Sequence, residues 1–560
     1  GVTVLMTRDC RGVACPGAGD DPLEAACLGG RCVDERCTPE TPEFCPAPEC
    51  GTSAECTDMI SDCADRVCED GTCFVSTDAA ICIPPNNYCD PTAGCSVAEL
   101  PTWVQEEYLK ASNAGADDAF GSSVALSADG NTLAVGAPLE KSAASDIGGL
   151  QSDDTASNAG AVYVFTRAGE MWTQQAYIKA SNTDVDDSFG GSVSLSADGN
   201  TLAVGAMGEA SAANTIDGDQ SNNSASDAGA VYVFTRVGET WAQQAYVKAS
   251  NTDAEDFFGG SVSLSADGDT LAVGARGEGS ATTNINGDES DDEADGAGAV
   301  YVFTRSGETW AQEAYVKASN AERLDSFGES VSLSSDGNTL AVGAVGEDSA
   351  ATTINGDQGA GAANAGAAYV FVRSAGEWTQ EAYVKASHSA GNFFFGRTVS
   401  ISADGNTLVA SSSVGIGYAY VFTKSGGSWA EQTRLIASNA SSGDRFAGSL
   451  SLSSDGNSLA IGAAEEDGAG AGAPESDNSV EWAGATYVFR RTGVTWTQEA
   501  YLKASAPGMN DLLGAGLCLS SDGSTLAVSA TGEASGDVGI DADQADNLAA
   551  AAGAVYTFTF

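Results

Sequence analysis

Histidine and basic residues are scarce in this 560-residue chain, which has one histidine, His388, and 24 lysines and arginines against 78 acidic residues. The formal net charge of −54 argues against nucleic acid and anionic membrane surfaces as partners, because phosphate contacts require lysine and arginine. With a single histidine, a Ser-His-Asp triad or a histidine-rich metal centre is not expected. No apolar run approaches the roughly 20 residues of a membrane-spanning helix, so we expect no membrane insertion.

Cysteine is nearly absent outside the N-terminal region: fourteen of the 15 cysteines lie between Cys10 and Cys95, and the last is Cys518. A dense, even set of this kind predicts disulfides formed in an oxidising compartment. Zinc is disfavoured because the spacings are irregular and histidine is lacking. We therefore expect residues 1–100 to form a small, disulfide-rich, loop-rich module of a secreted or cell-surface protein. Since the chain begins with Gly1 rather than Met, we also expect that a signal peptide has been removed.

A repeat with a usual period of 69 residues fills the chain from Trp103 onward. Each copy contains four segments of strand character, with an Asp-Gly hairpin signal between the first and second and a long acidic connection between the second and third. No segment has a convincing helical period. The seven copies begin with Phe-Gly or a degenerate form of it, at Phe120, Phe189, Phe258, Phe327, Phe395, Phe446 and Leu513.

The two ends of the repeat region predict that the repeats close into a ring. The last copy stops after its third strand, at residues 554–560, and an unpaired fourth strand precedes the first copy, at residues 103–111. A linear solenoid, the alternative, would have no use for this arrangement. We predict an all-β fold in which residues 101–560 form a seven-bladed β-propeller of four-stranded blades, with the N-terminal strand closing the last blade.

The repeats resemble the FG-GAP repeats of the integrin alpha-subunit propeller and its bacterial relatives. The resemblance rests on Phe120-Gly121, on Val-Gly-Ala-Pro at residues 135–138, and on their counterparts in later copies. It implies a secreted seven-bladed propeller that is used in adhesion or ligand binding, often with calcium. The family's calcium loop, D-x-D/N-x-D-G, is not carried over, because only Asp129-Gly130 match it and Ser127 stands where another carboxylate belongs.

Candidate calcium ligands lie instead in the long acidic connections between the second and third strands. Asp or Asn side chains there recur at positions i, i+2 and i+6 around a turn, and such oxygens can surround Ca²⁺ together with carbonyls and water. A solvated acidic loop with Asx turns is the alternative. The predicted ligands are Asp217, Asp219, Asn223, Asn286, Asp288, Asp292, Asn355, Asp357, Asp541, Asp543 and Asn547.

An aspartate stands two residues before the Phe or Leu in six copies, and Phe393 replaces it in the fifth. These aspartates could join a metal shell, but we favour a role in capping their own turns or in pairing with a lysine such as Lys110 or Lys179. The six are Asp118, Asp187, Asp256, Asp325, Asp444 and Asp511.

The tryptophan that begins each fourth strand is expected to pack between blades rather than to form a sugar-stacking ring. Trp482 lies outside that register and is a better candidate for a surface contact, while Cys518 is expected to fill a small core position as a free thiol. The fifth copy joins its second and third strands by only residues 411–417, which predicts a notch in the face that carries the acidic loops. The regular tryptophans are Trp103, Trp172, Trp241, Trp310, Trp378, Trp429 and Trp496.

The leading functional hypothesis is an extracellular, non-enzymatic adhesion or ligand-binding propeller that binds calcium and recognises a protein or glycan surface. The alternative is a structural subunit of a surface filament, sheath or layer, assembled from copies of itself through the β-prone segment at residues 1–7. A carboxylate-dependent hydrolase is the remote alternative, since carboxylate pairs are abundant but no distinctive constellation marks a site.

Overall fold

The computed structural model describes residues 66–69, 72–75, 88–90, 94–96, 102–544 and 546–560. The chain divides into two units, Gly1–Thr102 and Trp103–Phe560. In the first unit β1 (Arg66–Glu69) pairs antiparallel with β2 (Thr72–Val75), and β3 (Tyr88–Asp90) pairs antiparallel with β4 (Gly94–Ser96). The apolar segment at residues 1–7 lies outside the described residues, and the predicted disulfide framework stays a prediction.

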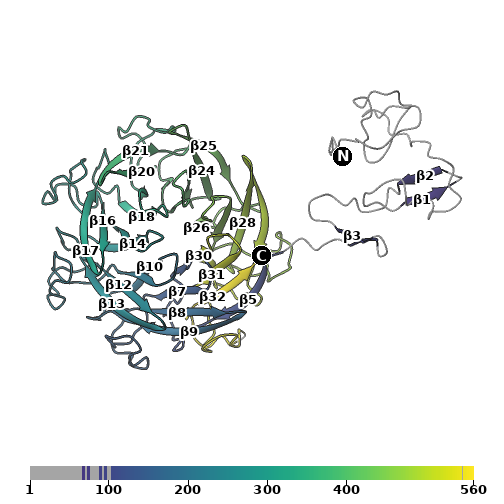
Figure 1. The fold of residues 1–560 in the computed structure, drawn as a ribbon, viewed down its shortest axis with the longest axis horizontal. Helices are drawn as coiled ribbons and strands as arrows, with labels where there is room; N and C mark the ends of the chain where they lie inside the picture. The colour runs from purple at the N-terminus through teal and green to yellow at the C-terminus, as the bar shows by residue number, and fades with distance from the viewer. Residues whose placement is uncertain (1–65, 70–71, 76–87, 91–93, 97–101, 545) are drawn as a thin grey trace. The chain divides into compact units, whose positions relative to one another are not determined.

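Seven four-stranded antiparallel sheets make up the second unit and are arranged in a ring (Figure 1). The first strand of each sheet lies nearest the centre and the fourth lies at the rim. Blade 1 contains β6 (Ser123–Leu126), β7 (Thr132–Ala137), β8 (Ala161–Ala168) and β9 (Met171–Ile178). Blade 2 contains β10 (Phe189–Leu195), β11 (Thr201–Ala206), β12 (Ala230–Val237) and β13 (Thr240–Val247). Blade 3 contains β14 (Phe258–Leu264), β15 (Thr270–Ala275), β16 (Ala299–Ser306) and β17 (Thr309–Val316).

The remaining blades follow the same order. Blade 4 contains β18 (Phe327–Leu333), β19 (Thr339–Ala344), β20 (Ala367–Ser374) and β21 (Glu377–Val384). Blade 5 contains β22 (Val399–Ile401), β23 (Thr407–Ser412), β24 (Tyr418–Ser425) and β25 (Ser428–Leu435). Blade 6 contains β26 (Phe446–Leu452), β27 (Ser458–Ala463), β28 (Ala485–Thr492) and β29 (Thr495–Leu502). Blade 7 contains β30 (Leu513–Leu519), β31 (Thr525–Ala530), β32 (Ala554–Thr559) and β5 (Val104–Leu109).

The composition of blade 7 confirms the predicted ring closure. Strand β5 pairs antiparallel with β32, and this pairing places Leu109 opposite Val555 and Tyr108 opposite Tyr556. The N-terminal strand of the propeller therefore supplies the fourth strand that the last repeat lacks. The all-β, seven-bladed architecture predicted from the repeats is confirmed as well.

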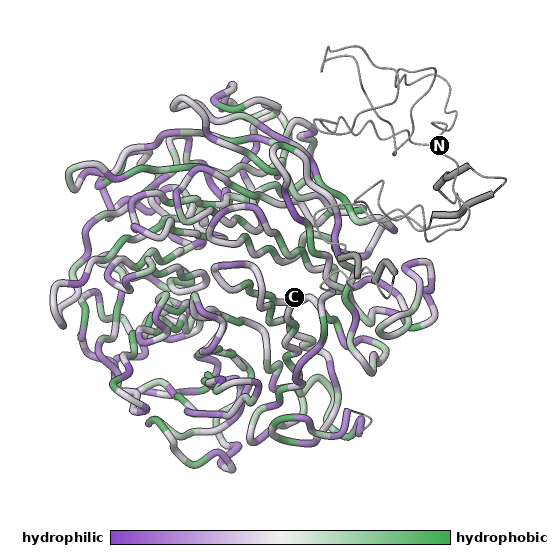
Figure 2. The backbone as a smooth tube through the Cα atoms, turned by 45° about the vertical axis from the view of Figure 1, so that its right-hand side comes forward, coloured by the Kyte–Doolittle hydropathy of each residue, from purple (hydrophilic) through white to green (hydrophobic). Residues whose placement is uncertain are grey.

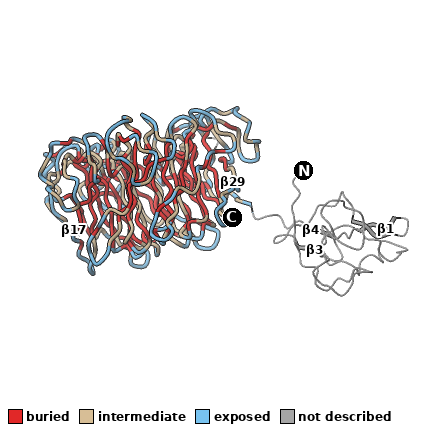
Figure 3. Tube along the Cα trace, turned by 90° about the horizontal axis from the view of Figure 1, so that it is seen from above, coloured by how far each residue is buried: buried red, intermediate tan, exposed pale blue. Residues whose placement is uncertain are grey.

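The apolar second strands and the Phe-Gly pairs form the core. The strand Thr-Leu-Ala-Val-Gly-Ala is buried along its whole length in β7, as predicted. Phe120 is fully buried against the ring of Tyr163, and Gly121 has a φ of 94°, which favours glycine. A Cβ on Gly136 would lie 2.0 Å from the carbonyl oxygen of Gly190 in the next blade, so both motif glycines permit close packing between blades. Hydrophobic and hydrophilic stretches alternate along the backbone in Figure 2, and the buried residues lie between two exposed sets of loops in Figure 3.

The Asp-Gly turns are joined to one another by a closed ring of backbone hydrogen bonds. The N–H of Ala128 donates to the carbonyl of Ala197 at 2.9 Å, and each following blade repeats this contact until Ser521 donates back to Ala128 at 3.0 Å. All seven blades therefore hold their neighbours through one residue of the turn. The members of this ring, in order, are Ala128, Ala197, Ala266, Ser335, Ala403, Ser454 and Ser521.

The antiparallel order of the strands separates the loops into two faces. The connections between strands two and three and those between strands four and one lie on one face, which we call the top face. The Asp-Gly turns and the short turns between strands three and four lie on the opposite, bottom face. The acid-bearing connections therefore share one face.

Removing residues 1–109 should destabilise the propeller, because β32 would lose its partner and expose an unpaired strand edge. We expect the thermal midpoint, measured by circular dichroism, to fall by at least about 10 °C, with concentration-dependent association. Removing only residues 1–102 is the matched control and should leave the midpoint unchanged. Equal midpoints for the two truncations would contradict the closing role of β5.

Candidate functional site

The top-face loops between strands two and three are held by a shared frame. In blade 2 the hydroxyl of Ser211 donates to the carbonyl of Asp219 at 2.8 Å, which closes the base of the loop. The backbone N–H of Asp217 donates to the carbonyl of Tyr246 at 2.8 Å, and its carboxylate accepts the N–H of Tyr246 at 2.9 Å. The loop is thereby joined to strand β13 of its own blade.

The same frame fixes the first residue of each predicted calcium loop. Asn286 and Asn355 make the equivalent contacts with Tyr315 and Tyr383, and Asp541 makes them with Tyr108. All four side chains, including that of Asp217, accept a hydrogen bond from the backbone of a fourth strand. These hydrogen bonds reach a distant segment of the chain, so they differ from the local Asx turns of the alternative interpretation.

The second predicted ligands cap turns at the loop tips. Asp219 accepts hydrogen bonds from the N–H and hydroxyl of Ser221, and Asp288 does so from Ser290. Asp357 accepts the N–H of Gly359 at 3.1 Å. The N–H of Asp543 donates to Asp537 at 3.0 Å. Asn547, the third predicted ligand of blade 7, is exposed.

The third predicted ligands face the neighbouring loop between strands four and one. In blade 2 the amide of Asn223 donates to the carboxylate of Asp184 at 2.8 Å. In blade 3 Asp292 replaces the asparagine and Asp253 replaces Asp184. Burial and the charge of Asp253 raise the pKa of Asp292. Among the described residues no group of three or more His, Cys, Asp or Glu is arranged to hold a metal ion, and the calcium sites stay a prediction.

A buried lysine–glutamate pair lies beneath the top-face loops of six blades and was not predicted from the sequence. In blade 2 the ammonium of Lys248 lies 3.1 Å from Glu209 and also donates to the carbonyl of Gly229. Both side chains are fully buried. The ion pairs are Lys110–Glu533, Lys179–Glu140, Lys248–Glu209, Lys317–Glu278, Lys385–Glu347 and Lys503–Glu466.

In five of the six pairs the glutamate also receives hydrogen bonds from other polar side chains, whereas Glu533 accepts the backbone N–H of Ser535. In blade 3 Glu278 accepts from Asn251 at 3.2 Å and from the hydroxyl of Tyr315 at 2.8 Å. Asn251 in turn accepts from the hydroxyl of Tyr301. The available sequence signal in these six blades was Lys-Ala-Ser after the fourth strand together with a Glu three residues after the last alanine of the second strand.

The six aspartates before the Phe or Leu cap their own turns, as favoured. Asp187 accepts the backbone N–H of Asp184 at 2.7 Å and is almost completely buried. Lys110 and Lys179 pair with Glu533 and Glu140 instead of with these aspartates. Burial raises the pKa of five of the six to about 6 or about 7: Asp118 and Asp511 to about 6, and Asp187, Asp256 and Asp325 to about 7.

The tryptophans pack at the bottom face between blades, as predicted. The guanidinium of Arg236 lies 5.2 Å from the ring centre of Trp241. It also donates to Gln175 and Thr132 of the preceding blade, and the Trp241 indole donates to Gln175 at 3.0 Å. Trp482, in contrast, is 44% exposed. The predicted free thiol of Cys518 accepts the N–H of Leu126 across a blade boundary.

Comparison with known families decides the identity of the repeats. The FG-GAP repeat family matches residues 103–165, 172–234, 241–303, 310–371 and 429–489. The chain belongs to the FG-GAP repeat family. This family is often involved in ligand binding. No curated protein sequence matches the chain.

Solved structures that resemble the FG-GAP propeller do so distantly. A putative 6-phosphogluconolactonase from Bacteroides uniformis is 11% identical with a TM-score of 0.41, covering 69% of this chain and 86% of its own. A chain of the Mitotic Checkpoint Complex is 13% identical with a TM-score of 0.43, covering 87% and 99%. The Cps50 (Swd1) β-propeller domain of Myceliophteria thermophila is 8% identical with a TM-score of 0.45, covering 82% and 99%. These likenesses carry no argument about function.

Blade 5 departs from the other FG-GAP blades, and its first three strands fall between two matched segments. Strands β23 and β24 are joined by residues 413–417 alone, which confirms the predicted short connection. The connection contains no carboxylate, and Ile436 occupies the position of the paired lysine. Phe393 packs against Tyr418 and Tyr420 where the other blades have the capping aspartate.

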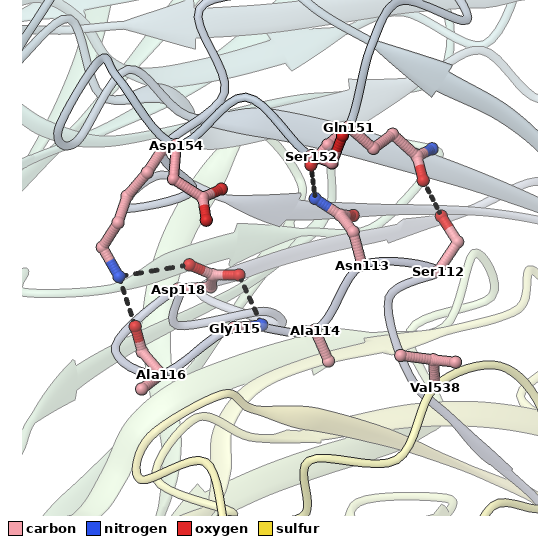
Figure 4. Close-up of a pocket in the computed structure, with 11 residues that line it drawn as sticks. Ser112, Asn113, Ala114, Gly115, Ala116, Asp118, Gln151, Ser152, Asp154 and Val538 are labelled. Atoms are coloured by element: carbon pink, nitrogen blue, oxygen red, sulfur yellow. Dashed lines mark hydrogen bonds and ion pairs between the residues drawn. The ribbon is translucent and has the colours of Figure 1, made fainter.

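A pocket of about 520 Å³ opens on the top face beside blade 1 (Figure 4). Its wall includes Asn113, Asp118, Lys141 and Asp154, and Val538 from blade 7. Lys141 donates to the carbonyl of Ala116 and lies 3.6 Å from Asp118. The pocket is polar and open, which suits a surface contact better than an enclosed reaction chamber. In the part of the chain that the structure describes, no helix is long and apolar enough to cross a membrane.

Replacing Glu209 by Gln should destabilise the FG-GAP propeller by about 3–5 kcal/mol, because it leaves the Lys248 ammonium buried without a counter-charge. The double variant Glu209→Leu/Lys248→Ile, which imitates blade 5, should recover most of that loss. Urea denaturation measures both. Glu465→Gln is the control, since its partner Arg445 is 62% exposed and the pair should contribute less than about 1 kcal/mol. A mild effect of Glu209→Gln, equal to the control, would contradict the buried pair.

The capping aspartates should make the protein more stable in weak acid than in weak base. Their folded-state pKa values of about 6 to about 7 exceed the ordinary value of 3.8, so the folded protein binds protons that the unfolded chain releases between these values. Their contribution to stability is therefore lost as the pH rises from about 4 to about 7. Asp187→Asn keeps the cap and should reduce this pH dependence by about 1–4 kcal/mol, measured by denaturation at pH 5 and pH 8. An unchanged dependence would contradict the burial of this carboxyl.

Proposed function

We propose that this protein is an extracellular, non-enzymatic propeller that binds a protein or glycan surface through the loops of its top face. One observation supports this above the others: the loops share a rigid frame but differ at their tips. Ser211, Ser280 and Ser349 close the loop bases in blades 2, 3 and 4 by the same hydrogen bond. Variable tips on a rigid scaffold are typical of recognition surfaces.

The loop tips differ in charge and in length while the frame stays constant. After the shared Asp, the sequence reads Gln-Ser-Asn-Asn in blade 2, Glu-Ser-Asp-Asp in blade 3 and Gln-Gly-Ala-Gly in blade 4. Asp219, Asp288 and Asp357 are exposed at these tips. A ring of blades with different tips can discriminate between partners, since each tip meets a different part of the partner's surface.

A binding role fits the chemistry of the described residues better than catalysis does. The buried glutamates are engaged by lysine, asparagine and tyrosine, and the buried aspartates cap turns. His388 is exposed and its ring contacts only the neighbouring hydroxyl of Ser387. No observation favours the hydrolase alternative.

Calcium is part of the same proposal. Asp253 and Asp292 face each other in blade 3 where blade 2 has a hydrogen bond between Asp184 and Asn223. A divalent cation would relieve their repulsion, and carboxylate oxygens are its preferred ligands. These residues would hold calcium together with carbonyls or water, and the ion would order the loop tips. The filament alternative depends on residues 1–7, outside the described part of the chain.

The proposal is tested by saturation binding of the labelled full chain to protein and glycan arrays, in millimolar calcium and in chelator. We expect saturable binding that falls in chelator, because the loop tips lose their order. The triple variant Asp219→Asn/Asp288→Asn/Asp357→Asn should weaken binding through the top face. The charge-matched control is Glu170→Gln/Glu239→Gln/Glu308→Gln, which changes exposed residues of the bottom-face turns.

Two results would contradict the proposal. Equal losses for the two triple variants would show that the top face has no special role. Non-saturable binding to every array, in calcium as in chelator, would show that the protein is not a recognition module. Calcium itself is tested separately by calorimetric titration of Asp292→Asn, which should bind the ion more weakly than the unsubstituted chain.

A further inference from the structure

Six blades place an internal carboxylate at the same spot under the top face. In blade 3 the carboxylate of Glu278 lies among Lys317, Asn251 and the hydroxyl of Tyr315. The glutamate is carried by the loop between strands two and three. We call this spot the carboxylate position of a blade.

Blade 5 lacks the internal carboxylate and changes the groups around it. Alignment of the repeats puts His388 at the position of Asn251, Arg434 at that of Tyr315 and Ile436 at that of Lys317. The strand register agrees, because Tyr420 pairs with Arg434 as Tyr301 pairs with Tyr315. The blade thus keeps hydrogen-bond donors at the carboxylate position but has no acid of its own there.

Arg434 is uncompensated in a strongly acidic protein. Its guanidinium lies 4.7 Å from the ring centre of Tyr418, is exposed, and forms no ion pair among the described residues. The exposed Arg445, in comparison, pairs with Glu465 at 2.8 Å. A stacked guanidinium is held in one orientation and presents its remaining N–H groups as a fork that matches a carboxylate.

The hydroxyl of the buried Tyr420 lies beside Arg434 and has no hydrogen-bond acceptor. Tyr420 is fully buried, and its hydroxyl makes no hydrogen bond of normal geometry. In blades 2 and 3 the equivalent hydroxyls, of Tyr232 and Tyr301, donate to an asparagine. An unsatisfied buried hydroxyl costs free energy, which an acceptor from outside would recover.

We infer that the top face of blade 5 is a carboxylate-binding site that receives a glutamate or aspartate side chain from a loop of a partner protein. Arg434 and the Tyr420 hydroxyl bind the carboxylate, and the open space of the missing loop admits the peptide that carries it. This inference rests on the proposed function, of which it names one contact.

The missing loop favours a peptide over an acidic glycan as the occupant. Strands β11 and β12 of blade 2 are joined by residues 207–229, whereas residues 413–417 make the same connection in blade 5. In six blades a glutamate on such a loop fills the carboxylate position. Ile436 is 45% exposed and Val414 is 43% exposed, and both would be covered by a peptide in the place of that loop.

The site is tested on the full chain by ligand-observed NMR titration with N-acetyl-glutamate N-methylamide. N-acetyl-glutamine N-methylamide is the uncharged match, and glucuronic acid is the carbohydrate carboxylate. We expect the glutamate compound to bind more tightly than both. Arg434→Gln should weaken that binding at least about tenfold, since a charge-assisted hydrogen bond is lost. Tyr420→Phe should weaken it by a smaller factor.

Arg445→Gln is the matched control, because Arg445 is already engaged by Glu465, and it should leave the dissociation constant unchanged. Equal binding of the glutamate and glutamine compounds, or unchanged binding to Arg434→Gln, overturns the site. If glucuronic acid binds more tightly than the glutamate compound, and if this binding depends on Arg434, the assignment of the ligand as a peptide is overturned. The Arg434→Gln variant could still bind the arrays while the NMR titration of the unsubstituted chain shows no binding. That result would overturn this inference alone and would leave the proposed function unaffected.

Discussion

The buried lysine–glutamate pair is the interaction on which the top face depends. It joins the end of a fourth strand to the start of the loop that follows the second strand, and it does so in a place from which water is excluded. Two isolated charges would not be stable there, because removing each from water costs several kcal/mol. In blade 3 the Glu278 carboxylate accepts hydrogen bonds from Asn251 and Tyr315, and in blade 2 the Lys248 ammonium donates to the carbonyl of Gly229. The polar network fixes the position at which each loop begins, and the positions of the loop tips depend on it.

Blade 5 is a natural double substitution of this pair. Lysine is replaced by Ile436, and the glutamate is lost together with its loop, so neither charge is left without a partner. The blade still folds as four paired strands, as expected when both members of a buried pair are replaced at once. The loss of the pair also uncovers groups that the other blades bury. Blade 5 can therefore acquire a new contact on its top face without weakening the other six blades.

The fold could be predicted from the sequence because its signals are local and repeated seven times. The number of blades follows from the repeated Asp-Gly turns and apolar second strands. Ring closure follows from the unpaired strand before Phe120. The lysine–glutamate pair could not be predicted in the same way, since Lys179 and Glu140 are 39 residues apart and meet only through the strand register. The spacing in the acidic loops was also ambiguous. It places oxygens at Asp217 and Asp219, but whether the Asp217 carboxylate faces solvent or the backbone of Tyr246 depends on the loop frame.

The ring of turn residues around Ala128 has a further consequence, for the number of repeats that this architecture accepts. Every N–H in it donates in the same rotational sense, and the seventh carbonyl is satisfied by the first blade, so the circle has no first or last member. Each blade contributes one donor and one acceptor, so a change in the number of repeats would keep donors and acceptors equal in number. It would, however, change the angle between neighbouring turns, and every hydrogen bond of the circle would have to adopt a new geometry. The geometry of each turn contact is therefore tied to the number of blades in the ring.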